Sequence, residues 1–145
     1  MSVVLKKAME FKKKYPLTIA WRLKKNCAVV DEHIGSDEKV LYVFVGQKNK
    51  KVFDWVTTCV VAITNRRILI GRKRVLFGYA IDSVMPYMFN DLNVRTNILW
   101  GTICIDTVDE DIFISNIDKA AMKEVSDNVS KNMFELKQLF QDSDK

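Results

Sequence analysis

Hydrophobic residues in the first part of the chain recur at helical spacing. Over residues 4–14 they share one face of a helix, with lysines between them. Pro16 ends this helix, because proline disfavours helical geometry in the residue before it. Over residues 17–34 hydrophobic residues again follow at intervals of three and four, with Thr18 near the start as a cap and Gly35 as a natural stop. The pattern predicts two N-terminal helices.

From Val40 onward the pattern changes to short runs of β-branched and aromatic residues, which favour strands. The first run has no polar alternation, which indicates a strand buried on both faces or strongly twisted. Thr-Asn-Arg-Arg at residues 64–67 is the clearest hairpin signal, because asparagine tolerates a left-handed backbone. Six or seven short strands without long helices between them indicate an antiparallel sandwich or barrel. The predicted strands comprise residues 40–45, 52–63, 68–71, 75–80, 85–89, 98–105 and 112–114.

The end of the chain returns to helical spacing. Hydrophobic residues step by three or four from Met122 to Phe140, and charged residues occupy the other side. Asp118 is the expected N-cap, or Asn116 if the helix begins earlier. Such a helix must bury its hydrophobic side, and the open end of a small barrel offers the space. We therefore expect a closing helix and then a frayed tail over residues 142–145.

This order of strands and final helix resembles the pleckstrin-homology (PH) fold. Residues 60–70 (VVAITNRRILI) resemble the aliphatic-T-N-R/K-R-aliphatic hairpin of bacterial PH domains and the related turn of GRAM domains. Residues 79–84 (YAIDSV) resemble the aromatic-x-I-x-S-V segment of that family, and the helix before Gly-Ser-Asp-Glu-Lys-Val is similar to the entry of its YokE-like branch. The resemblance covers roughly residues 17–141. Three hairpin residues are expected to set the turn and tie it to the sheet: Thr64, Asn65 and Arg67.

The resemblance implies an α+β, mainly β fold. We expect a PH-like antiparallel barrel or sandwich of about seven strands, with a C-terminal capping helix and an added N-terminal helical segment. The expected division is a helical extension over residues 1–35, the PH-like domain over 36–141 and the tail over 142–145. Bacterial PH domains are similar in lacking an enzyme site, and several assemble through strand edges into rings. The resemblance therefore implies a non-catalytic module that acts through protein contact, above all with copies of itself.

Composition agrees with one domain and offers little for catalysis. The chain has 145 residues, of which 48% are hydrophobic. Its three cysteines are widely separated and form no CxxC pair, so neither a disulfide framework nor a zinc site is expected. The single histidine, His33, has no HExxH context, and the GxSxG and P-loop spacings are missing from the sequence. No cofactor or metal is predicted. The following carboxylates are interpreted as a solvated acidic turn: Asp106, Asp109, Glu110 and Asp111.

Charge divides the chain in two. Residues 1–103 carry 18 Lys and Arg against 8 Asp and Glu, whereas residues 104–145 carry 5 against 10. The basic part suits phosphate, anionic lipid or an acidic protein, and it suits equally the acidic helix of a neighbouring copy. Two predicted strand turns hold the candidate residues for an anion, a lipid or an acidic partner, with merely solvated turns as the alternative. These candidates are Lys48, Lys50, Lys51, Arg72, Lys73 and Arg74.

A second basic set lies in the first predicted helix. Its members are Lys6, Lys7, Lys12, Lys13 and Lys14. With hydrophobic residues between them, they suit a helix that contacts a membrane surface, its own domain or another copy. Capture of an acidic protein is a third hypothesis, and nucleic acid is disfavoured because the aromatic residues form no stacking platform. No hydrophobic run approaches the roughly 20 residues of a bilayer helix, so a cytoplasmic location is expected, with peripheral membrane attachment as the alternative.

Overall fold

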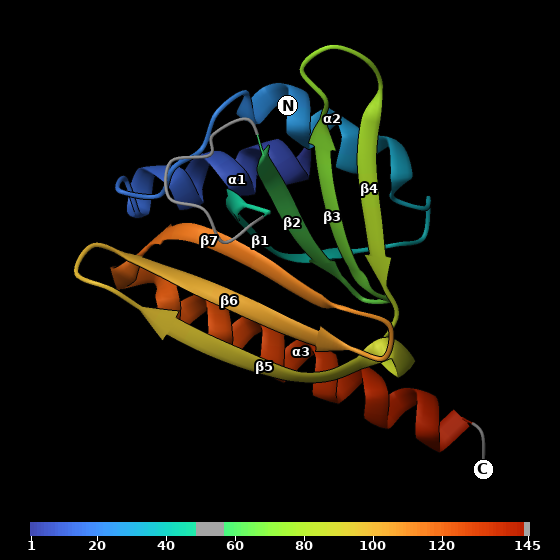
Figure 1. Cartoon of the computed structure of the whole chain (residues 1–145). Coiled ribbons are helices and arrows are strands. Elements are labelled where there is room, and N and C mark those ends of the chain that lie inside the picture. Colours follow the sequence, from blue (N-terminus) through green and yellow to red (C-terminus); the bar gives the residue numbers. More distant parts are fainter. Residues whose placement is uncertain (49–56, 144–145) are drawn as a thin grey trace.

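A seven-stranded antiparallel sheet covered by helices forms the described part of the chain, residues 1–48 and 57–143 of a computed structural model (Figure 1). The elements follow in this order: α1 (Val3–Lys14), α2 (Leu23–His33), β1 (Val40–Gln47), β2 (Thr58–Thr64), β3 (Ile68–Lys73), β4 (Tyr79–Val84), η2 (Pro86–Met88), β5 (Phe89–Thr96), β6 (Trp100–Thr107), β7 (Asp111–Asp118), η3 (Lys119–Ala121) and α3 (Met122–Ser143). The strands lie in the order β4-β3-β2-β1-β7-β6-β5. The predicted fold class, mainly β with a C-terminal helix, is confirmed.

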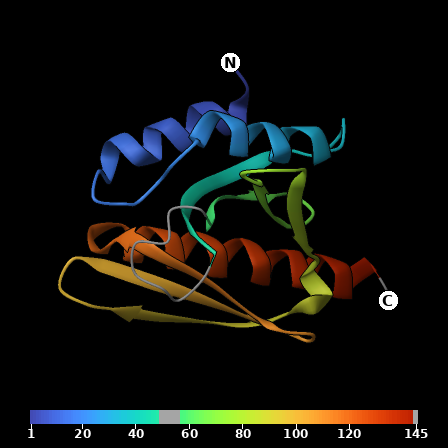
Figure 2. The same cartoon turned by 45° about the horizontal axis from the view of Figure 1, so that its top comes forward.

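The sheet bends sharply between β1 and β7. In the described residues their register contains one pair, Gln47 opposite Ser115, so the other strands splay into two halves (Figure 1). Gly46 permits the close approach, because a Cβ atom there would lie 2.7 Å from Cγ2 of Ile114. Figure 2 shows α1 and α2 outside the first half and α3 between the two halves. The final helix therefore closes the curled sheet.

Strands β1 and β2 are buried on both faces. Residues 43–47 of β1 and all seven residues of β2 are buried. The outer face is covered by α1 and α2, and the inner face contributes to the core that α3 closes. The helices lie very close to the sheet, since a Cβ atom on Gly71 would come within 2.7 Å of Cγ2 of Val30. The interpretation of the first hydrophobic run as a doubly buried strand is confirmed for its last three residues, 43–45.

The second helix is shorter than predicted. It begins at Leu23, because Arg22 has a left-handed backbone (φ 54°) that interrupts helical geometry. Thr18 is not a helix cap. It is buried, and its hydroxyl oxygen accepts a hydrogen bond of 2.9 Å from the backbone N–H of Asp118. The segment before α2 is thus fixed by the end of β7 rather than by its own helical spacing.

The number of strands was predicted correctly, but several positions were wrong. Residues 75–78, predicted as part of a strand, form a turn, and the predicted strand over 85–89 is largely the 3₁₀-helix that Pro86 begins. Residues 90–93, which lie between two of the predicted strands, are part of β5, whose exposed position at the sheet edge requires no hydrophobic alternation. Residues 52–56 of the second predicted strand lie outside the described residues.

A buried ion pair fixes the β2–β3 hairpin. Arg67 donates to both carboxylate oxygens of Glu38, over 2.9 Å from Nη2 to Oε1 and 3.1 Å from Nε to Oε2. The hydroxyl of Thr64 and the backbone N–H of Gly35 also donate to this carboxylate, whose side chain is 2% exposed. Arg67 further donates to the carbonyl of His33. The network joins the end of α2, the entry to β1 and the hairpin, which confirms the predicted role of Thr64 and Arg67. Asn65 exchanges backbone and side-chain hydrogen bonds with Lys39, but its backbone is not left-handed, so that part of the hairpin prediction was wrong.

We expect the Glu38 network to make stability depend on acid pH. Burial raises the pKa of Glu38, but the hydrogen bonds from Arg67, Thr64 and Gly35 outweigh it and lower this pKa from 4.5 to about 2. The stabilisation is therefore complete above pH 4.5 and is lost as the pH falls toward 2. The stability advantage of the wild type over Glu38→Gln should shrink by about 2 kcal/mol between pH 6 and pH 3 in urea unfolding.

Asp37→Asn is the control for this measurement, because Asp37 forms an exposed ion pair with Arg66. We expect that substitution to change stability by less than about 1 kcal/mol. An advantage over Glu38→Gln that stays the same at pH 6 and pH 3 would contradict the interpretation.

A carboxylate on α3 ties the first helix to the barrel. Glu124 accepts hydrogen bonds from Lys14 Nζ at 2.7 Å, from the Tyr42 hydroxyl at 2.8 Å and from the Tyr15 hydroxyl at 3.0 Å. Burial raises the pKa of Glu124, but these donors outweigh it and hold the pKa below its ordinary value. The cluster links the end of α1, strand β1 and helix α3.

Removal of Lys14 should therefore raise the pKa of Glu124. We expect Lys14→Met to do so, measured from the pH dependence of the Glu124 side-chain carboxyl ¹³C shift. Lys13→Met removes an adjacent, exposed lysine of the same helix and should leave that pKa unchanged. Equal pKa values of Glu124 in the wild type and in Lys14→Met would show that the ion pair is weak in solution.

Candidate binding surfaces

The predicted lysines of the first helix are used in different ways. Lys12 donates to the carbonyl oxygens of Pro16 and Thr18, at 2.6 and 2.7 Å, and Lys14 pairs with Glu124. Lys6 and Lys13 are exposed, and Lys7 is half-buried. The hydrophobic side of the helix is buried in the core through Val4, Ala8 and Phe11. The exposed lysines therefore project from a helix whose main apolar face already packs on the domain.

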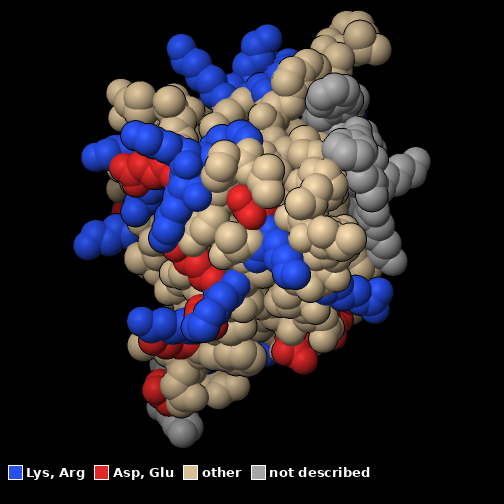
Figure 3. Space-filling model, turned by 90° about the vertical axis from the view of Figure 1, so that its left-hand side faces the viewer, with Lys and Arg blue, Asp and Glu red and all other residues tan. Residues whose placement is uncertain are grey.

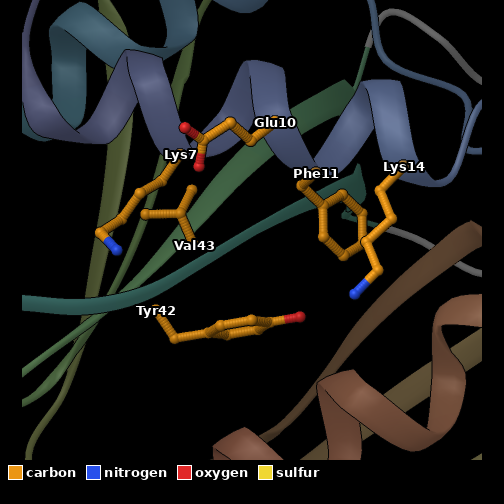
Figure 4. A pocket seen from close by; sticks show the side chains of 6 residues that line it. All are labelled: Lys7, Glu10, Phe11, Lys14, Tyr42 and Val43. Carbon is orange, nitrogen blue, oxygen red and sulfur yellow. The ribbon is translucent and has the colours of Figure 1, made fainter.

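A small groove lies between α1 and β1. It has a volume of about 200 Å³ and is lined by Lys7, Glu10, Phe11, Lys14, Tyr42 and Val43. Figure 4 shows the ammonium groups of Lys7 and Lys14 on the same side of α1, with the Tyr42 ring between them. Glu124 neutralises Lys14, and Glu10 lies on the same helix as Lys7. The groove thus has little net positive charge with which to attract an anion.

Of the basic residues predicted at the strand turns, the four that the structure describes have different surroundings. Lys48 pairs with Asp82 on β4, and Lys50 and Lys51 lie outside the described residues. Arg72 and Lys73 belong to β3 rather than to the turn, and Arg74 follows them. Burial raises the pKa of the Cys59 thiol to about 12, and the charges of Lys48 and Arg72 oppose the rise.

Lys73 is held against the second helix instead. Its backbone N–H donates to Oδ1 of Asn26 at 2.7 Å, and Nη1 of Arg22 approaches its carbonyl oxygen at 3.5 Å. These contacts bring the start of α2 beside the end of β3. Sequence spacing could not show this, because the partners are 47 and 51 residues apart.

Two features were missed by the sequence interpretation. The turn after β3 exposes Leu76 and Phe77 to 83% and 84%, although the hydrophobic run was predicted as a strand. Strand β5 forms one end of the sheet, and every residue from Asn90 to Thr96 except Leu92 is exposed. The sequence interpretation placed the turn at the Arg-Lys-Arg triplet, whereas Arg72 and Lys73 still belong to β3 and the turn follows them. Nothing in the composition of β5 indicated a strand.

The remaining candidates for chemistry form no catalytic arrangement that we recognise. Asp106 and Asp111 lie opposite each other on β6 and β7, and desolvation and the hydrogen bond with Asp111 raise the pKa of Asp106. Asp109 and Glu110 are exposed at the tip of that hairpin. His33 contacts the carbonyl of Val29 through Nδ1. Within residues 1–48 and 57–143, no group of three or more His, Cys, Asp or Glu side chains is placed to hold a metal ion.

On the face drawn in Figure 3, charge is distributed rather than concentrated. Figure 3 shows Lys and Arg side chains over much of one face, with Asp and Glu side chains between them. None of the helices in the described part of the chain has the length and hydropathy needed to cross a bilayer.

Comparison with known proteins identifies the family. No curated protein matches the chain. Among solved structures, the crystal structure of a pleckstrin homology domain from Shewanella amazonensis SB2B is similar to it, with 11% sequence identity and a TM-score of 0.47, over 72% of this chain and 85% of that one. The model of the bacterial PH domain family matches residues 34–131, well over half of the sequence. The chain belongs to the bacterial PH domain family.

Proposed function

We propose that this protein is a non-catalytic binding module whose partner is a second copy of itself, paired along strand β5. Domains with the PH-like fold are binding modules in general, and they place their ligand sites on loops and edges. The observation that carries the proposal is the open edge of β5. This strand is eight residues long and, in the described part of the chain, pairs with β6 alone.

The edge carries little of the usual protection against pairing, apart from one register shift near its start, between Phe89 and Asp91. Natural edge strands are commonly shortened, or carry proline and lysine, which prevent another strand from adding to them. Strand β5 has neither residue type, and Asp91 and Arg95 are its only charged residues. Its exposed backbone groups are therefore suited to β-augmentation by a further strand. The opposite edge, β4, is six residues long, and every residue in it after Tyr79 is half-buried or buried, so it is less open.

The two charges on β5 suit pairing with an identical strand. In a two-fold antiparallel pairing centred on Asn93, Asp91 of one copy lies opposite Arg95 of the other, and the same contact occurs twice. Opposite charges across neighbouring strands stabilise a pair, and like charges destabilise it. The strand is thus self-complementary, which is the requirement for an isologous dimer.

Charge reversal on β5 tests the proposal. We expect the wild type to form a dimer by light scattering at moderate salt, and Arg95→Asp to weaken the dimer about tenfold, because it places four carboxylates together at the interface. Asp91→Arg should weaken it similarly. The double exchange, Asp91→Arg with Arg95→Asp, should restore dimerisation because complementarity returns with the charges inverted.

Lys131→Asp serves as the control for charge reversal, since Lys131 is an exposed residue on α3. Circular dichroism of every variant should show the same fold. A wild type that remains monomeric at high concentration, or a double exchange that stays as weak as the single variants, would rule out this mode of pairing.

A further inference from the structure

The turn between β3 and β4 exposes a hydrophobic tip. Figure 1 shows this turn projecting beyond the rest of the molecule. Leu76 and Phe77 are 83% and 84% exposed, so neither side chain packs on the domain. The turn is nevertheless shaped by its own backbone, because the N–H of Arg74 donates to the carbonyl of Gly78 at 3.0 Å and Gly78 has φ 70°. Two large apolar side chains are therefore presented to solvent by an ordered hairpin.

Cationic side chains lie close to the base of this tip. Three of them precede it directly in the chain, and the hydrogen bonds of Lys73 with Asn26 and Arg22 place the start of α2 beside them. Neither residues 22–25 nor residues 72–79 contain an aspartate or a glutamate. Asp82, farther along β4, is paired with Lys48. The cations in these two segments are Arg22, Lys24, Lys25, Arg72, Lys73 and Arg74.

Two aromatic side chains, Trp21 and Tyr79, flank these cationic segments in the sequence. Trp21 precedes α2, is partly exposed, and has the guanidinium of Arg22 over its ring at 5.4 Å from the ring centre. Tyr79, at the start of β4, is also partly exposed. Tryptophan and tyrosine are enriched at the level of lipid headgroups, because one end of the side chain is apolar and the other is polar.

We propose that the β3–β4 tip inserts into the surface of an anionic lipid membrane. Leu76 and Phe77 enter the boundary between headgroups and acyl chains, and the six cations contact lipid phosphates around them. Apolar insertion combined with electrostatic attraction is the usual physics of peripheral attachment. Charge and shape together favour a lipid surface. The cations lie at the base of a projecting turn and can contact anionic headgroups. A fluid bilayer adapts to such a projection, whereas a folded protein partner would need a matching hollow.

This arrangement predicts dependence on net lipid charge rather than on one headgroup. The cations stand on flexible side chains around a projection, so no rigid set of donors is shaped to a particular phosphate pattern. The site is also independent of the β5 edge, since β4 and β5 are the two opposite ends of the strand order. Failure of one proposal therefore leaves the other intact.

Vesicle sedimentation of the full chain tests the inference. At 0.1 M salt we expect binding to vesicles of phosphatidylcholine with 30% phosphatidylglycerol, and at least tenfold weaker binding to phosphatidylcholine alone. Replacing the phosphatidylglycerol by an equal charge of phosphatidylserine should leave binding unchanged. Leu76→Ser with Phe77→Ser, and separately Lys73→Glu with Arg74→Glu, should each weaken binding at least tenfold, and 0.5 M salt should weaken wild-type binding.

A matched control comes from the other exposed hydrophobic hairpin tip. Ile98 and Leu99, between β5 and β6, are 88% and 45% exposed, and Ile98→Ser with Leu99→Ser should bind vesicles like the wild type. Arg95→Asp, designed to block dimerisation, should still bind vesicles as a monomer, which separates the two proposals.

Three results would overturn the inference. The first is equal recovery of the wild type in the supernatant with anionic and with neutral vesicles. The second is an equal loss of binding in the Ile98 and Leu99 variant. The third is the absence of vesicle binding together with self-association that disappears in the Leu76 and Phe77 variant, which would identify the tip as a protein contact.

Discussion

Burial of β1 and β2 on both faces is the constraint on which the rest of this structure depends. Strands with hydrophobic side chains on both faces need a layer on each side: α1 and α2 cover the outer face, and the inner face lies in the hydrophobic core that residues of α3 share. The main hydrophobic side of α1 is buried in this way through Val4, Ala8 and Phe11, whereas Leu139 and Phe140 near the end of α3 stay exposed. The two surfaces proposed above lie on an exposed sheet edge and on an exposed turn.

The sequence predicted the elements that carry this constraint and was weaker on the elements that do not. Three local patterns predicted their elements correctly because the side chains concerned are buried or tied to the core. They are the hydrophobic run at 40–45, the hairpin at 64–67 and the helical spacing of α3. Residues 75–77 are equally hydrophobic but lie in a turn, because hydrophobicity in a sequence indicates a tendency to be buried and not burial itself. Strand β5 was not predicted for the opposite reason: its Asn and Asp residues disfavour strands in general and are tolerated at this exposed edge.

The basic residues illustrate a limit of another kind. The sequence interpretation grouped the basic residues by their positions along the chain. In the folded structure, the charge that each residue offers for binding depends on the partner it meets. Lys14 is neutralised by Glu124, 110 positions away, and Lys48 by Asp82, while Arg22 is brought to Lys73. A long-range partner cannot be inferred from spacing, so the charge available for binding is smaller in α1 and more focused at the β3–β4 turn than the lysine runs indicate.

The two proposed surfaces also support each other physically. A tip with two inserting side chains and a few cations binds a membrane weakly and reversibly, as single-anchor attachments generally do. A dimer paired along β5 would carry two such tips, and the strand order keeps β4 and its turn out of the pairing edge. Once one tip is inserted, the second is held at a high effective concentration near the same surface, provided the geometry lets both reach it. Self-association would then determine how firmly the protein stays attached without any new contact to lipid.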